Sequence, residues 1–87
     1  MTGRRVYPDA EGHLRLAEGD YGRETNGEWV GRPPGCHAGS FARHEVTEHE
    51  DGTITVSPSI LLKEVEPDGN HREVWHGYLE RGVWRAC

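Results

Sequence analysis

The stretch EHEDGTITVSPSILL, residues 48–62, decides the fold that we expect for this chain of 87 residues. Asp51-Gly52 is a strong turn dipeptide, and the β-branched run TITV follows it directly. In an extended chain Ile54 and Val56 share one face, and the threonines share the other. The pattern predicts a strand that leaves a tight hairpin turn.

The segment SPS at 57–59 interrupts this strand. Pro58 has no N–H to donate to a ladder, so it belongs at an edge, a bulge or a strand end. Beyond it, the run Ile60, Leu61 and Leu62 presents apolar groups to both faces. We therefore interpret SPS as a structural hinge between one strand and a second. The sheet is expected to bend or to change its exposed face there. A functional serine is the alternative, but no basic group nearby in sequence is placed to activate one.

The segment 72–80 is the longest strand candidate. Turn signals lie on both sides of it, at 67–70 and at 81–82. Residues 83–86 then return along it and carry Trp84. Alternation along the long strand places Val74, His76 and Tyr78 on one face and Trp75, Gly77 and Leu79 on the other.

Residues 1–35 are dense in turn-forming residues and are poorly patterned. A short strand is predicted at 4–7. An Asn-Gly dipeptide predicts a hairpin in which 21–24 pair with 28–30. The segment 8–19 is the best place for a short helical turn.

Together these patterns predict a mainly β protein: a small antiparallel meander of four to five strands, with an irregular, turn-rich N-terminal half and little helix. We expect a single small β domain over 1–87, in which 1–35 is an irregular segment that packs on a sheet formed by 41–87. Hydrophobic residues make up only 33% of the chain, so its three tryptophans should dominate a thin core.

The formal net charge is −5, and no basic block is present. This composition disfavours nucleic acid as a partner, because binding to a phosphate backbone requires clustered lysine or arginine. No apolar run approaches the length that crosses a bilayer. The first residues carry no apolar core of a signal peptide. We expect a protein without membrane contact that remains in the cytoplasm where it is made, with reduced cysteines.

Histidines and cysteines raise the question of a metal site. The nearest approach to one is Cys36-His37, with His76 and Cys87 as distant complements. None of these residues has the close spacing typical of structural zinc sites. Neighbouring side chains in a strand also point to opposite faces. The metal site is kept as an alternative, and no cofactor is expected.

The aromatic residues Trp75, Tyr78 and Trp84 lie in the C-terminal hairpin. Trp75 and Trp84 fall on facing strands, where they can form a cross-strand pair. One interpretation is that the tryptophans form the core. The other is that one sheet face is left open, where these aromatic residues would mark a binding surface. An unpaired edge strand offers a second route to self-association.

Four segments carry a resemblance: GDYGR (19–23), RPPG (32–35), HEVTEHEDGTITVSPSILL (44–62) and WHGYLERGVWR (75–85). Together they resemble small uncharacterised proteins of actinobacterial phages, of the mycobacteriophage type. SPSI followed by an aromatic hairpin is also similar to a wider bacterial and phage family of unknown function. Some members of that family carry the label ammonia monooxygenase.

The ammonia monooxygenase label has no support in this chain, which has no evident copper or iron site. Members of the wider family often have a CxxC or Cys-His feature, to which only Cys36-His37 would correspond here. Trp75 stands where a cysteine is common. The resemblance implies a phage origin and supplies no catalytic residue.

We therefore expect a non-enzymatic phage accessory protein in the host cytoplasm. It would act through contacts with a host protein or with itself, for example as a homodimer joined at a sheet edge. One alternative is a small metal-binding protein that uses Cys36, His37 and other histidines. Another is an acidic protein that blocks a nucleic-acid-binding host protein.

Overall fold

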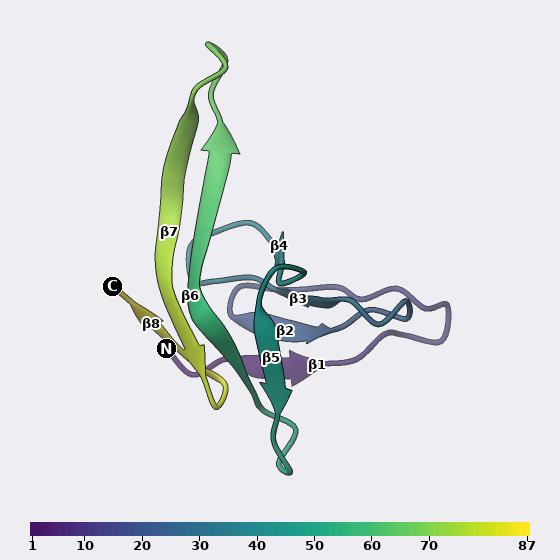
Figure 1. The fold of residues 1–87 in the computed structure, drawn as a ribbon. Coiled ribbons are helices and arrows are strands. Elements are labelled where there is room, and N and C mark those ends of the chain that lie inside the picture. The colour runs from purple at the N-terminus through teal and green to yellow at the C-terminus, as the bar shows by residue number, and fades with distance from the viewer.

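A computed structural model describes all residues, 1–87, and contains eight strands and no helix (Figure 1). The strands are β1 (Arg4–Val6), β2 (Asp20–Arg23), β3 (Trp29–Gly31), β4 (Gly39–Ser40), β5 (Glu45–Glu48), β6 (Ile54–Val65), β7 (His71–Glu80) and β8 (Val83–Ala86). They form two four-stranded sheets, ordered β1-β2-β3-β4 and β5-β6-β7-β8. The prediction of a mainly β protein with an antiparallel meander and little helix is confirmed.

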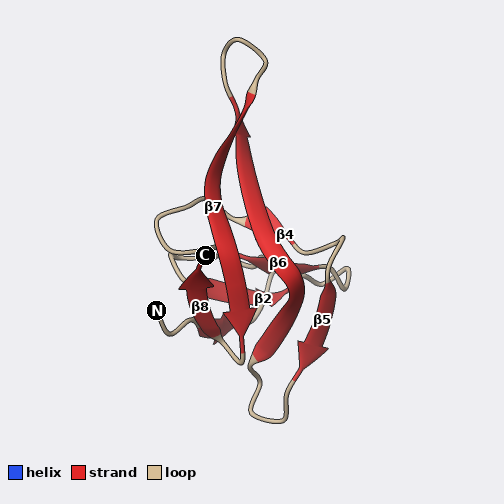
Figure 2. Cartoon of the chain, turned by 60° about the vertical axis from the view of Figure 1, so that its left-hand side comes forward, coloured by secondary structure: helices blue, strands red, loops and turns tan.

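The second sheet is the predicted meander, and each of its neighbouring strands is antiparallel to the next. Its turns lie at the expected dipeptides, where Gly52, Gly69 and Gly82 adopt positive φ. Strands β6 and β7 are much longer than their neighbours. Their far ends leave the rest of the molecule as a two-stranded projection (Figure 2). We call residues 63–73 the distal arm.

The SPS segment lies within one continuous strand, β6, so the prediction of two separate strands is wrong. Val56 pairs with Leu79, whereas Ile60 pairs with Gly77. The segment of β6 between these pairs therefore contains two more residues than the facing segment of β7. The extra residues form a bulge at 57–59, which includes a cis peptide bond before Pro58.

The bulge bends β6 but does not exchange its faces. Two is an even number, so the alternation of side chains resumes in the same phase after the bulge. Ile54, Val56 and Ile60 are accordingly all buried, at 0–2% exposure. β6 is curved (Figure 1), and its buried residues keep the same face on both sides of the bulge, so the predicted change of face is not observed.

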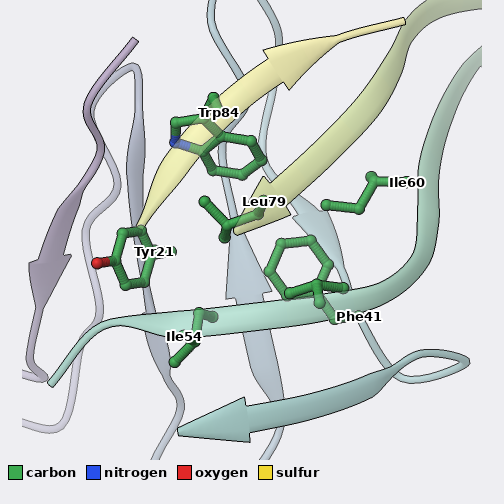
Figure 3. Packing of buried hydrophobic residues seen from close by; sticks show 7 residues of the cluster. Tyr21, Phe41, Ile54, Ile60, Leu79 and Trp84 are labelled. Carbon is green, nitrogen blue, oxygen red and sulfur yellow. The ribbon is translucent and has the colours of Figure 1, made fainter. Parts of the chain in front are cut away.

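The core lies between the two sheets (Figure 3). Its seven buried residues are Tyr21, Phe41, Ile54, Val56, Ile60, Leu79 and Trp84. Trp84 is the largest of them, and its indole N–H donates to the Gly19 carbonyl at 2.8 Å. A buried indole needs such an acceptor, so the hydrogen bond helps to hold the loop before β2 against β8.

Two glycines make room for the large rings of this core. A Cβ at Gly31 would lie 2.5 Å from Cζ of Phe41. A Cβ at Gly77 would lie 2.6 Å from Cη2 of Trp75 and would also strike the Arg85 carbonyl. These contacts are too close for any side chain, so each sheet carries a glycine where an aromatic ring crosses it.

The N-terminal half is more ordered than its composition suggests. The predicted strand at 4–7 is observed as β1, and the predicted hairpin is observed as β2 and β3. The parallel pairing of β1 with β2 had no signal in the sequence. It is held by Asp20, which is 3% exposed and accepts two hydrogen bonds from the Arg4 guanidinium, at 3.2 and 3.0 Å.

The helical turn predicted within 8–19 is absent. Oδ1 of Asp9 instead accepts the backbone N–H groups of Glu11 and His13, at 2.9 and 3.0 Å. A short acidic side chain that captures nearby amides in this way competes with helix formation. The result is a tight turn, closed by a hydrogen bond from the N–H of Gly12 to the carbonyl of Asp9.

Candidate functional site

The second sheet buries one face against the core and exposes the other. Six large hydrophobic residues of the protein are exposed: Met1, Tyr7, Leu61, Val65, Tyr78 and Val83. Four of them belong to this sheet, and we call Leu61, Val65, Tyr78 and Val83 the apolar stripe. Their exposures are 43%, 68%, 40% and 39%.

Strand register places the stripe on one face. Paired residues of an antiparallel ladder point to the same side, and residues two apart along a strand share a face. Leu61 pairs with His76, so Tyr78 lies diagonally across from Leu61. Val83 pairs with Glu80, two residues beyond Tyr78. Leu61, Tyr78 and Val83 thus form a diagonal across three strands.

Val65 extends the stripe onto the distal arm. It shares the parity of Leu61 along β6 and pairs with His71. Between the Leu62 and Lys63 pairs, β7 contains one extra residue and β6 contains none. The alternation of side chains along β6 is therefore unbroken from Leu61 to Val65. Lys63 lies between Leu61 and Val65 on this face, so a charged residue separates Val65 on the arm from the diagonal of Leu61, Tyr78 and Val83.

Charged side chains border the stripe and, at Lys63, interrupt it. Lys63 pairs in register with Glu73, and both are exposed. The guanidinium of Arg85 lies 5.8 Å from the ring centroid of Tyr78 and forms an ion pair with Glu80. An apolar centre with a charged and polar rim is the usual composition of a protein-binding patch.

The distal arm is held by polar contacts, because it has no core beneath it. Arg72 forms ion pairs with Glu64 at 2.9 Å and with Glu66 at 2.8 Å. These carboxylates, chiefly through the hydrogen bond to Glu64, raise the pKa of Arg72. At the tip, hydrogen bonds from the backbone and side chain of Asn70 lower the pKa of Asp68. A two-stranded arm is marginal in water, so these contacts favour its extended form.

The three predicted aromatic residues have different environments. Tyr78 lies on the stripe, as an exposed binding residue would. Trp75 is half-buried and packs against the core. Trp84 is only 2% exposed, so it is a core residue and has no surface to offer a partner. The prediction of Trp84 as a surface binding residue is therefore wrong. The other interpretation, in which the tryptophans belong to the core, is the correct one for Trp84.

Sequence reasoning missed the contributions of Leu61, Val65 and Val83 to this surface. The alternation of Leu61 with the buried Ile60 is the available signal for Leu61. The position of Val65 depends on where the bulges lie, and that of Val83 on the β7–β8 register. Neither can be read from the local sequence.

The metal candidates do not converge. The buried thiol of Cys36 lies 3.6 Å from the Val74 carbonyl, whereas Nδ1 of His37 lies 3.6 Å from Oε1 of Glu64. His76 and Cys87 are neighbours, since the Cys87 N–H donates to the His76 carbonyl at 2.9 Å. No group of three His, Cys, Asp or Glu side chains is arranged to hold a metal ion.

The environment of Cys36 disfavours its thiolate. Burial raises the pKa of this thiol, and the carboxylates of Glu64 and Glu18 raise it further. A thiol with a raised pKa is a poor nucleophile and a poor metal ligand at neutral pH, because both roles require the thiolate.

Comparison of the chain with protein-family models, with curated proteins and with solved structures finds no match. The structure has no helix long and apolar enough to cross a membrane. No related protein therefore indicates the candidate site, which is defined only by the exposed residues of this molecule.

Proposed function

We propose that this is an accessory protein encoded by an actinobacterial phage. It acts in the host cytoplasm through direct contact with another protein, and the apolar stripe is its contact surface. The observation that carries the proposal is that Leu61, Tyr78 and Val83 form one exposed diagonal on the outer face of the second sheet. Exposed apolar residues that gather on one face and carry a charged rim favour a protein partner.

The open face is favoured over a strand edge as the contact surface. The β8 edge of the second sheet is partly covered by the bridge between Thr2 and Val83. The β5 edge carries exposed Glu45 and Glu48. Charged edge residues disfavour the addition of another strand. A partner, whether a host protein or a second copy of the chain, is therefore expected on the face.

Nucleic acid is not the proposed partner. Several arginines are already paired with carboxylates, including Arg4 with Asp20 and Arg72 with Glu64. Together with the net charge of −5, this pairing leaves little cationic surface for a phosphate backbone.

Affinity capture from host lysate, with mass spectrometry, tests the proposal when it is run on matched variants. The wild type should recover a specific protein that the double variant Leu61→Glu/Tyr78→Glu does not recover. Tyr7→Glu is the matched control, because Tyr7 is an exposed aromatic residue outside the stripe. Sedimentation of the pure protein should be run alongside to detect self-association. A strictly monomeric protein that recovers nothing specific would show that the proposal is wrong.

A further inference from the structure

The bulge at 57–59 brings a serine to a histidine from the neighbouring strand. Oγ of Ser59 lies 3.1 Å from Nε2 of His76, although the two residues are 17 apart in sequence. Bulges re-aim single side chains and are over-represented beside active sites. This contact supplies the basic group that the local sequence around Ser59 lacks.

The surroundings hold both partners of this contact in place. Nε2 of His44 lies 3.1 Å from the Ser59 carbonyl and so steadies the bulged backbone. On the other side of the His76 ring, Oε1 of Glu73 lies 3.7 Å from Nδ1. The separation is too long for a hydrogen bond, so Glu73 places a negative charge beside the ring without fixing its proton. In the tautomer with the proton on Nδ1, Nε2 is free to accept the Ser59 proton.

Space for a small molecule lies next to His76. A hollow of about 450 Å³ is lined by Glu73, Val74, Trp75, His76, Ala86 and Cys87. The hollow is shallow and open to solvent, and Trp75 and Val74 supply apolar contact area. Ser59 itself does not line the hollow, so an acyl compound seated there would reach Ser59 from the side of His76.

From this geometry we infer that Ser59 is a reactive nucleophile that accepts an acyl group from activated esters or thioesters. Oγ of Ser59 forms a bond to the acyl carbonyl carbon, and the bond from that carbon to the leaving oxygen or sulfur breaks. The Ser59 proton passes to Nε2 of His76 and then to the departing alkoxide or thiolate. The product is a serine ester and a free alcohol or thiol. The acylation needs no protein partner, but His76 pairs with Leu61, so the site adjoins the apolar stripe and a partner bound there would restrict access to it.

The probe is p-nitrophenyl acetate. Intact-mass spectrometry measures the number of acetyl groups added, and peptide mapping locates them. Peptide mapping separates acetylation of Ser59 from acetylation of the one exposed thiol, Cys87. We expect one acetyl group on Ser59, formed faster than at any other serine. Ser59→Ala should lose it, and His76→Gln should slow it by at least about a hundredfold, the usual effect of removing a general base.

Controls separate chemistry from folding. Ser57→Ala, in the same bulge, should leave the acetylation of Ser59 unchanged. Glu73 acts as a positioning residue through its charge, so Glu73→Gln, which keeps the shape of the side chain, should slow the acetylation less than His76→Gln does. Near-UV circular dichroism confirms that each variant is folded. Acetylation of Ser59 no faster than that of Ser57, or equally fast in folded His76→Gln, overturns the inference.

Discussion

Trp75 meets Trp84 edge to face, with ring centroids 5.6 Å apart and ring planes at 86°. The two residues are not directly opposed, because Trp84 pairs with Leu79 and Trp75 pairs with Leu62. Their rings meet because the position between them on β7, Gly77, has no side chain. Edge-to-face pairs of this kind add about 0.5–1.5 kcal/mol beyond the area that they bury. The predicted aromatic pair is therefore real, but it is a diagonal contact within the core.

Truncation of the two tryptophans should have unequal effects. Trp84→Ala removes a fully buried ring and should lower the free energy of unfolding by about 3–5 kcal/mol. Trp75→Ala removes a half-buried ring and should cost about 2 kcal/mol. Urea denaturation followed by circular dichroism measures both values. Equal losses would contradict the placement of Trp84 inside and Trp75 at the margin of the core.

Gly77→Ala should destabilise the protein through steric overlap. The new methyl group would overlap the backbone of β8 at Arg85 and Ala86 as well as the Trp75 ring. Backbone cannot move aside as a side chain can, so we expect a loss of about 3 kcal/mol or more. Gly35→Ala is the comparison, because that position has open space and only an unfavourable φ of 72°. Thermal unfolding should show the smaller loss there, of about 1–2 kcal/mol.

The two cysteines should differ sharply in reactivity. Cys36 is buried and the pKa of its thiol is raised, whereas Cys87 is exposed. Iodoacetamide at neutral pH should modify one thiol quickly, and peptide mapping should locate the modification at Cys87. Cys87→Ser should abolish the fast phase, and addition of denaturant should expose Cys36. Fast modification of Cys36 in the folded protein would mean that its burial is wrong.

The turn before β6 should stabilise the protein in a pH-dependent way. The hydroxyl of Thr53, at 2.6 Å, and then its backbone N–H, at 3.0 Å, hold the pKa of Asp51 below its ordinary value. A depressed pKa in the folded state means stabilisation that is complete above the unfolded-state pKa, about 4, and is lost as the pH falls through the folded-state pKa.

Thr53→Val should move the pKa of Asp51 upward, toward its ordinary value, and shrink the acid-dependent loss of stability. NMR titration of the side-chain carboxyl groups measures this directly. Asp68 is the internal control, because its lowered pKa depends on Asn70 at the far end of the hairpin. A titration of Asp51 that does not change in Thr53→Val would show that the hydroxyl contributes nothing.

The meander was predictable because its signals are local. Alternation places Ile54, Val56 and Leu79 on one face, and Gly-containing turns set the ends of the strands. The hairpin of β2 and β3 followed in the same way from one Asn-Gly dipeptide. Such features depend on a few adjacent residues, so they need no knowledge of the rest of the chain.

Contacts between distant segments were not predictable. The salt bridge from Arg4 to Asp20, which fixes a parallel strand pair, joins two residues with no shared local pattern. The contact of Ser59 with His76 depends on the exact number of residues in a bulge. The apolar stripe likewise needs the register of three strands, which the sequence around Tyr78 does not reveal.

The most direct test of the proposed function is the affinity of the protein for its partner, measured with and without the stripe. The ligand is the captured host protein or, if sedimentation shows self-association, the second copy. Two central apolar contacts should each contribute as hot spots do, so Leu61→Glu/Tyr78→Glu should raise Kd at least about a hundredfold. Tyr7→Glu should leave Kd within about threefold of the wild type. A folded double variant that binds as tightly as the wild type would contradict the assignment of the stripe as the contact surface.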